Sequence, residues 1–220
     1  MSRGLLILGA GGNSLGIVDA IEAVASGGSH KVAGFLDDLP ENRGRRVLGY
    51  PVLGTIEDAH KYPDYLLVNG ISSVASFRKR EAIVARCKSA RERFATVIHP
   101  SAVVSPRATL GQGCVVLANS VVCPEAVLED HVLILQGSTV NHHTCVEAHA
   151  TLSAGVTLLG YVGIGRSAFV GGGASVAPYV KIGAGALVGM GSVVIRDVER
   201  GSVVAGNPAR PLRNSQYRES

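Results

Sequence analysis

A strict repeat of six residues constrains this chain more than any other feature. From Ile98 to Val194 every sixth residue is Val, Ile or Leu, without a gap. Two residues before these positions the side chains are mostly small ones, chiefly Ala, Ser, Thr or Cys. A period of six fits neither a helix nor a half-buried strand. It is the hexapeptide signature of a parallel β-helix, whose coils stack and bury one aliphatic side chain on each face.

Three hexapeptides make one triangular coil, so residues eighteen apart are expected to lie above one another. One such column contains Pro106, Pro124, His142, Gly160 and Pro178. Proline suits the corners because its φ is fixed and it loses no ladder hydrogen bond there. A histidine in this place can accept a proton near neutral pH, and a glycine above it can leave a backbone amide open to a ligand. The competing interpretation of His142 is an ordinary surface histidine.

The other histidines help to separate base catalysis from metal binding. The column beside His142 is expected to stack Arg107, Glu125, His143, Tyr161, Tyr179 and Asp197. His131 and His149 are also eighteen apart, and we expect an exposed stacked pair on an outer face. A zinc site needs several imidazoles converging on one ion, and the spacing of His142, His143 and His149 does not supply them. We therefore expect no metal.

The N-terminal segment reads as a small nucleotide-binding unit. An apolar strand, Leu5–Leu8, leads into a glycine turn and then into an amphipathic helix over residues 17–25. Such a turn offers backbone N–H groups and a helix N-terminus to an anion. The next strand, residues 31–36, ends in two carboxylates, where such units bind a ribose or a base edge. The candidate nucleotide-sugar contacts are Gly11, Gly12, Asn13, Ser14, Asp37 and Asp38.

This unit is too short for a complete dinucleotide fold. Further strands are expected at residues 65–68 and 95–98, with helices near 56–60 and 77–88, giving four or five parallel strands. Only half of a dinucleotide fold fits, so a mononucleotide moiety is expected. Arg78 begins the last helix and can reach a phosphate, although a solvated arginine fits equally well. The predicted organisation is a Rossmann-like unit over 1–95, a left-handed β-helix over 96–200 and an extension over 201–220.

Composition narrows the class of partner. The formal net charge is only +4, and the chain contains six Tyr, four Phe and no Trp, so a basic face with aromatic stacking platforms for nucleic acid is not expected. Four cysteines without C-x-x-C spacing suggest reduced thiols. The N-terminal apolar run is too short for a signal peptide, and no stretch of about 18 apolar residues predicts a membrane span. We expect a cytoplasmic protein without nucleic-acid or membrane partners.

The segment Gly206-Asn-Pro-Ala-Arg210, closing an unbroken hexapeptide coil, resembles the end of hexapeptide-repeat acyltransferases that bind acetyl-CoA. With the glycine-turn unit in front, nearly the whole chain is similar to sugar-nucleotide N-acetyltransferases of the bacillosamine and perosamine type. Sialic-acid O-acetyltransferase-like proteins share this layout. The resemblance implies acetyl-CoA as co-substrate, a nucleotide-linked 4-amino-4,6-dideoxy sugar as acceptor, and a homotrimer with active sites between subunits.

The resemblance also implies roles for individual residues. His142 matches the catalytic base, with His143 and Gly160 beside it, and Asp37 and Asp38 match contacts to the nucleotide. The CoA contacts that it implies are Gly160, Gly172, Met190, Asn207, Pro208 and Arg210.

Three residues depart from the family pattern. Asn13 and Thr151 stand where histidines are usual, and His143 stands where a carboxylate usually orients the base. Because an amine acceptor needs only a modest base, we expect N-acetylation by direct transfer. Two alternatives stay open: O-acetylation of a sugar hydroxyl, and a non-catalytic nucleotide-sugar sensor or scaffold.

Overall fold

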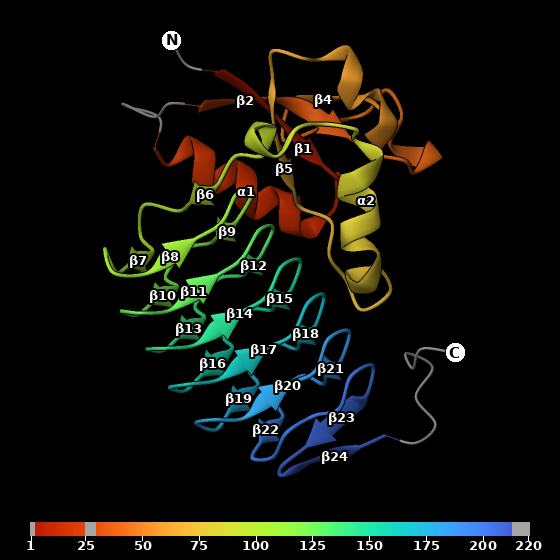
Figure 1. Cartoon of the computed structure of the whole chain (residues 1–220). Helices are drawn as coiled ribbons and strands as arrows, with labels where there is room; N and C mark the ends of the chain where they lie inside the picture. Colours follow the sequence, from red (N-terminus) through yellow and green to blue (C-terminus); the bar gives the residue numbers. More distant parts are fainter. Residues whose placement is uncertain (1–2, 25–29, 213–220) are drawn as a thin grey trace.

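The computed structural model of the chain describes residues 3–24 and 30–212. Figure 1 shows an N-terminal α/β unit beside a tall stack of short strands. The unit has one sheet with the strand order β3-β4-β2-β1-β5, in which only β3 is antiparallel to its neighbour. Its strands are β1 (Arg3–Leu8), β2 (His30–Leu36), β3 (Arg46–Val47), β4 (Tyr50–Gly54) and β5 (Leu66–Asn69).

Helices of this unit are short. They are α1 (Gly12–Glu22), α2 (Arg80–Arg86) and the 3-10 helices η1 (Pro40–Asn42), η2 (Ile56–Lys61), η3 (Phe77–Lys79) and η4 (Arg91–Arg93). Residue 25 of the predicted first helix lies outside the described residues. The predicted strand at 95–98 is wrong as a member of this sheet, because Val97–Ile98 forms β6, the first strand of the coil. The structure adds β3 and β4, which the sequence analysis missed.

The second part is a left-handed parallel β-helix, as the repeat predicts. Its strands form three sheets, named PB1, PB2 and PB3. PB1 contains β7 (Val103–Val104), β10 (Val121–Val122), β13 (Thr139–Val140), β16 (Thr157–Leu158), β19 (Ser175–Val176) and β22 (Val193–Val194). PB2 contains β8 (Thr109–Leu110), β11 (Val127–Leu128), β14 (Cys145–Val146), β17 (Gly163–Ile164) and β20 (Lys181–Ile182). PB3 contains β6, β9 (Val115–Val116), β12 (Leu133–Ile134), β15 (Thr151–Leu152), β18 (Phe169–Val170), β21 (Leu187–Val188), β23 (Val203–Gly206) and β24 (Ala209–Pro211).

The register confirms the eighteen-residue stacking. Val121, for example, pairs with Val103 on one side and with Thr139 on the other. The stacking ends at the last coil, where Leu187 pairs with Val203 and Ile182 with Val198, only sixteen residues on. The predicted place of Asp197 above Tyr179 is therefore wrong. The Asp197 carboxylate instead accepts the Lys181 N–H at 2.8 Å.

Two cores meet along PB3. The inward aliphatic side chains of the repeat form one continuous core inside the coil. The outward side chains of PB3 are buried as well, because the N-terminal unit covers them; they are Val97, Val115, Leu133, Thr151, Phe169, Leu187 and Val203. The first three of these share a core with β1 and α1, and Phe77 packs on Phe169. The N-terminal unit is thus packed against PB3, one of the three faces of the triangular β-helix. Within the described residues no helix is long and apolar enough to cross a membrane.

Candidate active site

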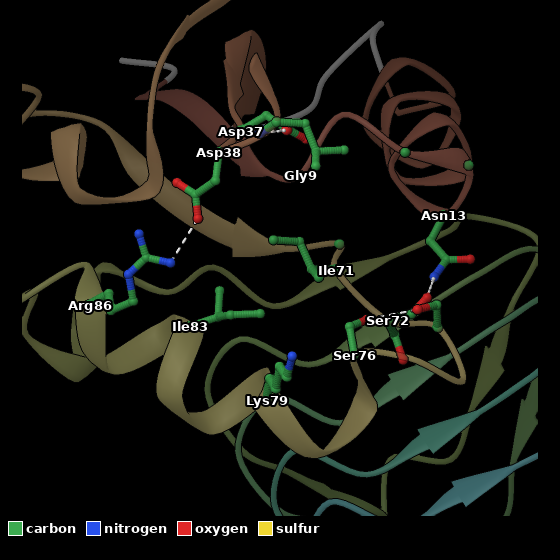
Figure 2. Close-up of a pocket in the computed structure, with 15 residues that line it drawn as sticks. Gly9, Asn13, Asp37, Asp38, Ile71, Ser72, Ser76, Lys79, Ile83 and Arg86 are labelled. Carbon is green, nitrogen blue, oxygen red and sulfur yellow. Dashed lines mark hydrogen bonds and ion pairs between the residues drawn. The ribbon is translucent and has the colours of Figure 1, made fainter. Parts of the chain in front are cut away.

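A cavity of about 690 Å³ lies at the edge of the N-terminal sheet where β1, β2 and β5 end (Figure 2). The glycine turn forms one of its walls. A Cβ atom at Gly11 or Gly12 would meet no protein atom within 4 Å, and Gly11 has an extended backbone that any residue can adopt. Packing therefore does not require these two glycines. Their missing side chains leave the N-terminus of α1 open to a ligand.

The two carboxylates after β2 shape the same cavity. Asp37 is 6% exposed, and its two oxygens accept the Ala10 N–H at 2.6 Å and the Leu39 N–H at 2.8 Å. Asp37 thereby ties the glycine turn to the end of β2. Asp38 accepts the Ile56 N–H and pairs with Arg86 at 2.7 Å. Both carboxylates line the cavity, and both also hold its walls in place.

The cations at the cavity are Lys79 and Arg86, not Arg78. Arg78 turns to the coil, where its Nε donates to the Gly185 carbonyl at 2.9 Å and its guanidinium lies over the Phe77 ring. Lys79 points into the cavity in Figure 2, and no ion pair of Lys79 is found within the described part of the chain. Lys79 is thus the better candidate for a phosphate contact.

The loop after β5 lies against the glycine turn and also lines the cavity, a contribution that was not predicted from the sequence. Asn13 bridges the cavity by donating to the Ser72 carbonyl at 2.7 Å. The Ser72 hydroxyl in turn contacts that of Thr151 on PB3 at 2.8 Å. Ser14, by contrast, is buried beneath the turn, where its hydroxyl donates to the Gly9 carbonyl. The sequence does hold a signal for this loop, because Asn69, Gly70, Ser72 and Ser73 follow directly on the apolar residues of β5. Parallel strands end at the same edge of a sheet, so residues at that place can line the same cavity.

His142 lies at the corner between PB1 and PB2, which we name corner 1. Its imidazole covers Gly160 in the next coil, where a Cβ atom would stand 2.5–3.1 Å from three ring atoms. Only glycine fits beneath the ring. The His142 N–H donates to the Asn141 side chain at 2.8 Å. The imidazole itself is exposed. No hydrogen bond of the Gly160 N–H is found among the described residues, and Gly160 itself is buried beneath the ring.

His131 and His149 lie at the corner between PB2 and PB3, named corner 2. The two rings stack at 4.9 Å as expected, but the prediction that they are exposed is wrong. They are only 5% and 6% exposed, because Phe94 and Arg80 of the N-terminal unit cover them. The buried Arg80 donates to the carbonyls of both histidines at 2.7 and 3.0 Å, and to that of Ile71. Burial and the Arg80 charge lower the pKa of His131 to about 4, and burial, His131 and Arg80 lower that of His149 to about 3.

The residues expected to bind CoA fall into two groups. Gly160 belongs to corner 1. Gly172 and Met190 stack at the corner between PB3 and PB1, named corner 3, where Met190 is 84% exposed. Asn207 and Pro208 form the turn between β23 and β24, with Arg210 on β24. The Gly206 N–H donates to Ser192, which places this hairpin beside the Met190 turn.

Comparisons with known proteins agree with this architecture. The sequence profile of the PglD N-terminal domain family matches residues 4–87. The acetyltransferase domain of PglB from Neisseria gonorrhoeae FA1090, solved in complex with acetyl coenzyme A, is 32% identical with a TM-score of 0.84. That match covers 96% of this chain and 100% of the PglB domain. The chain belongs to this family of acetyltransferases.

Other solved structures match over nearly the same length. A histidine-to-alanine variant of GDP-perosamine N-acetyltransferase from Caulobacter crescentus, solved with CoA and GDP-perosamine, is 30% identical, with a TM-score of 0.84. This match covers 96% of this chain and 97% of the other. WeeI from Acinetobacter baumannii AYE is 25% identical, with a TM-score of 0.70, and the match covers 96% and 100% of the two chains. Among curated protein sequences, none matches the chain.

The geometry of this acetyltransferase keeps its candidate groups apart within one chain. The cavity belongs to the unit that covers PB3. Corner 1, which carries His142, is the edge of the triangular β-helix that lies opposite PB3. Corner 3 is the edge between PB3 and PB1. The cavity and His142 of one chain therefore lie on opposite sides of its coil.

Proposed function

We propose that the protein transfers an acetyl group from acetyl-CoA to the 4-amino group of a nucleotide-linked 4-amino-4,6-dideoxy sugar. The observation that carries this proposal is the pairing of an open glycine-turn cavity with a histidine corner on the coil. Relatives that match nearly the full length hold acetyl-CoA, or CoA and GDP-perosamine. Lys79 and the N-terminus of α1 suit a diphosphate, and Asp37 and Asp38 suit a ribose or a base edge.

The reaction we infer is direct transfer. The sugar amine attacks the thioester carbonyl, so a C–N bond forms while the C–S bond breaks. His142 accepts a proton from the attacking amine and returns it to the CoA sulfur, which leaves as a thiol. The Gly160 N–H is a suitable donor to the developing oxyanion. A covalent route through Cys145, on the adjacent strand β14, is disfavoured because burial, Glu129 and Glu147 raise the pKa of its thiol.

The active site must then lie between subunits. A second copy is needed to bring corner 1 to the cavity, since the two are on opposite sides of one β-helix. We propose a homotrimer in which each cavity faces His142 of a neighbour, with CoA in the groove between two coils. The outward side chains of PB1 favour such packing, because they carry no charge; they are Val103, Val121, Thr139, Thr157, Ser175 and Val193.

The reaction is tested by incubating the protein with acetyl-CoA and a panel of UDP-, GDP- and dTDP-linked 4-amino sugars, with release of free thiol as the readout. An amine acceptor predicts thiol release with the amino sugars and none with their 4-hydroxy counterparts. Release only with the hydroxyl compounds would instead establish the O-acetyltransferase alternative. A protein that binds the nucleotide sugar but not acetyl-CoA would be a sensor.

Sharing of the site between subunits is tested with two variants that are inactive on their own. His142→Ala removes the base, and Gly11→Leu fills the cavity at a position where the fold has room for a side chain. Because each site would combine a cavity with a neighbour's histidine, co-expression in equal amounts should restore about a quarter of the wild-type activity in random trimers. Mixed oligomers without activity would mean that each chain uses only its own groups.

A further inference from the structure

His142 has one neighbour that can control where its imidazole proton resides. The Nδ1 atoms of His142 and His143 lie 3.2 Å apart, and the two rings are nearly perpendicular, at 85°. A contact of this length between two ring nitrogens is a hydrogen bond only when one of them carries a proton and the other does not. The pair therefore links the tautomer of one histidine to that of the other.

Two neutral arrangements satisfy this contact. In the first, His142 carries its proton on Nδ1 and donates to His143, which leaves the His142 Nε2 lone pair free. In the second, His143 donates and His142 carries its proton on Nε2. Only the first arrangement makes His142 a proton acceptor at its outer nitrogen. Which nitrogen is protonated is set by the partner of the other nitrogen.

The aromatic side chains at corner 1 hold the His143 ring in place. The ring lies parallel to that of Tyr161 in the next coil, with centroids 4.6 Å apart and planes 19° apart. Tyr161 stacks in turn on Tyr179, at 4.9 Å and 9°. All three residues have a positive φ, between 57° and 64°, so they occupy equivalent places in successive coils. This stack fixes the plane of the His143 ring, and within that plane Nδ1 is the atom that contacts His142. Gly160 leaves the space that the His142 ring needs.

Resting on the proposed function, we propose that His143 is a positioning residue that accepts the Nδ1 proton of His142 and so fixes it in the tautomer of a base. The acceptor is a neutral imidazole held by a tyrosine stack. A His143 ring that carries a proton on Nδ1 has no lone pair there and cannot accept the His142 proton. The charged or titratable side chains in the same column are Arg107 and Glu125, two coils and one coil before, and Tyr161 and Tyr179, one and two coils after.

Three substitutions at His143 separate this role from simple packing. His143→Phe keeps a ring that can stack on Tyr161 and lacks an acceptor. It should lower kcat by about 10²-fold, the lower end of what a general base contributes, with the KM for acetyl-CoA nearly unchanged. His143→Asn suits a positive φ, and its side-chain oxygen can accept the same proton, so most of kcat should return. His143→Asp should move the acidic limb of the pH–rate profile upward, because a carboxylate favours the imidazolium.

A measurement that does not depend on turnover completes the test. In protein labelled with 15N-histidine, at a pH where the imidazoles are neutral, His142 should show a protonated Nδ1 and an unprotonated Nε2. Its signals are assigned by their loss in His142→Asn. In His143→Phe, His142 should change to the Nε2–H form. A wild-type His142 protonated at Nε2, or a His143→Phe variant with unchanged kcat and pH profile, would overturn the proposal. A protein that acetylates no sugar would instead refute the proposed function, while the tautomer would still be measured.

Discussion

Two histidine pairs lie on the same coil and have opposite surroundings. His142 and His143 stand exposed at corner 1, whereas His131 and His149 stack at corner 2 beneath the N-terminal unit. Three of the four occupy the same kind of turn position, with a φ between 57° and 63°. The hexapeptide repeat thus offers equivalent places for histidine, and the N-terminal unit decides which places remain open to solvent.

The difference separates a histidine pair that is open to a substrate from a pair that belongs to the protein core. The corner 2 rings are held neutral, since burial and the Arg80 charge lower their pKa values far below the ordinary range. Both Nδ1 atoms are buried, and neither has a hydrogen-bond partner within residues 3–24 and 30–212. A Cβ atom on Gly113 would stand 2.6 Å from the Nδ1 atom of His131. Such rings cannot exchange protons with a substrate. At corner 1 both rings are open to the outside.

The largest effect should come from the exposed pair. Changing His142→Ala removes the proposed base, so kcat should fall by about 10²–10⁴-fold, with a much smaller change in the KM for acetyl-CoA. The thermal midpoint should hardly change, because the ring is exposed. Steady-state kinetics and a melting curve on the same preparation measure both quantities. An unaltered kcat would remove His142 from the mechanism and leave the two pairs without a functional difference.

A comparably large effect on stability should come from the buried side. Arg80 is 1% exposed and donates to three carbonyls, two of them at corner 2. Arg80→Met keeps the length of the side chain but leaves these carbonyls unpaired, so the loss should be about 3–5 kcal/mol. The thermal midpoint should fall by about 10 °C at constant protein concentration.

The matched control for Arg80 is Arg91→Met. Arg91 forms an exposed ion pair with Asp130 beside the same corner, and such pairs contribute only about 0–1 kcal/mol. Equal melting shifts in the two variants would mean that the covering of corner 2 by Arg80 adds nothing beyond an ordinary surface ion pair.

The repeat made the coil predictable because each hexapeptide repeats the same local requirement: an aliphatic side chain inward and a small one at the turn. The burial of PB3 beneath the N-terminal unit was not predictable in this way. The burial of His131 and His149 depends on Arg80 and Phe94, which are far from them in sequence. A period of eighteen places residues on a face of the coil, and it contains no information on which face another unit covers.

The candidate site was predictable in part for the same reason. His142 and Gly160 were identified because they interrupt a column of prolines, and the structure places the ring directly over that glycine. Arg78 was misplaced, since the short η3 helix turns it toward the coil and leaves Lys79 at the cavity. The loop carrying Ser72 has no periodic pattern, so only its place at the end of a parallel strand could have indicated it.

The smallest effect, and the most direct measure of the difference between the pairs, is the response to acid. The pKa of His131 is lowered to about 4 and that of His149 to about 3, whereas an unfolded histidine titrates near 6.5. The unfolded chain therefore binds more protons below pH 6.5, so the stabilisation is fully present above that pH and is lost as the pH falls toward 4.

The lowered pKa values of Asp58 and Asp130 matter only below about pH 4. We expect the wild type to be less stable at pH 4.5 than at pH 6.5, measured as a fall in thermal midpoint at constant protein concentration. His149→Asn, which suits the positive φ as Asn119 does in another coil, should lower the midpoint at neutral pH and flatten this dependence, whereas His143→Asn should leave the slope unchanged. A wild-type midpoint independent of pH across this window would show that burial does not lower the pKa values of the corner 2 histidines.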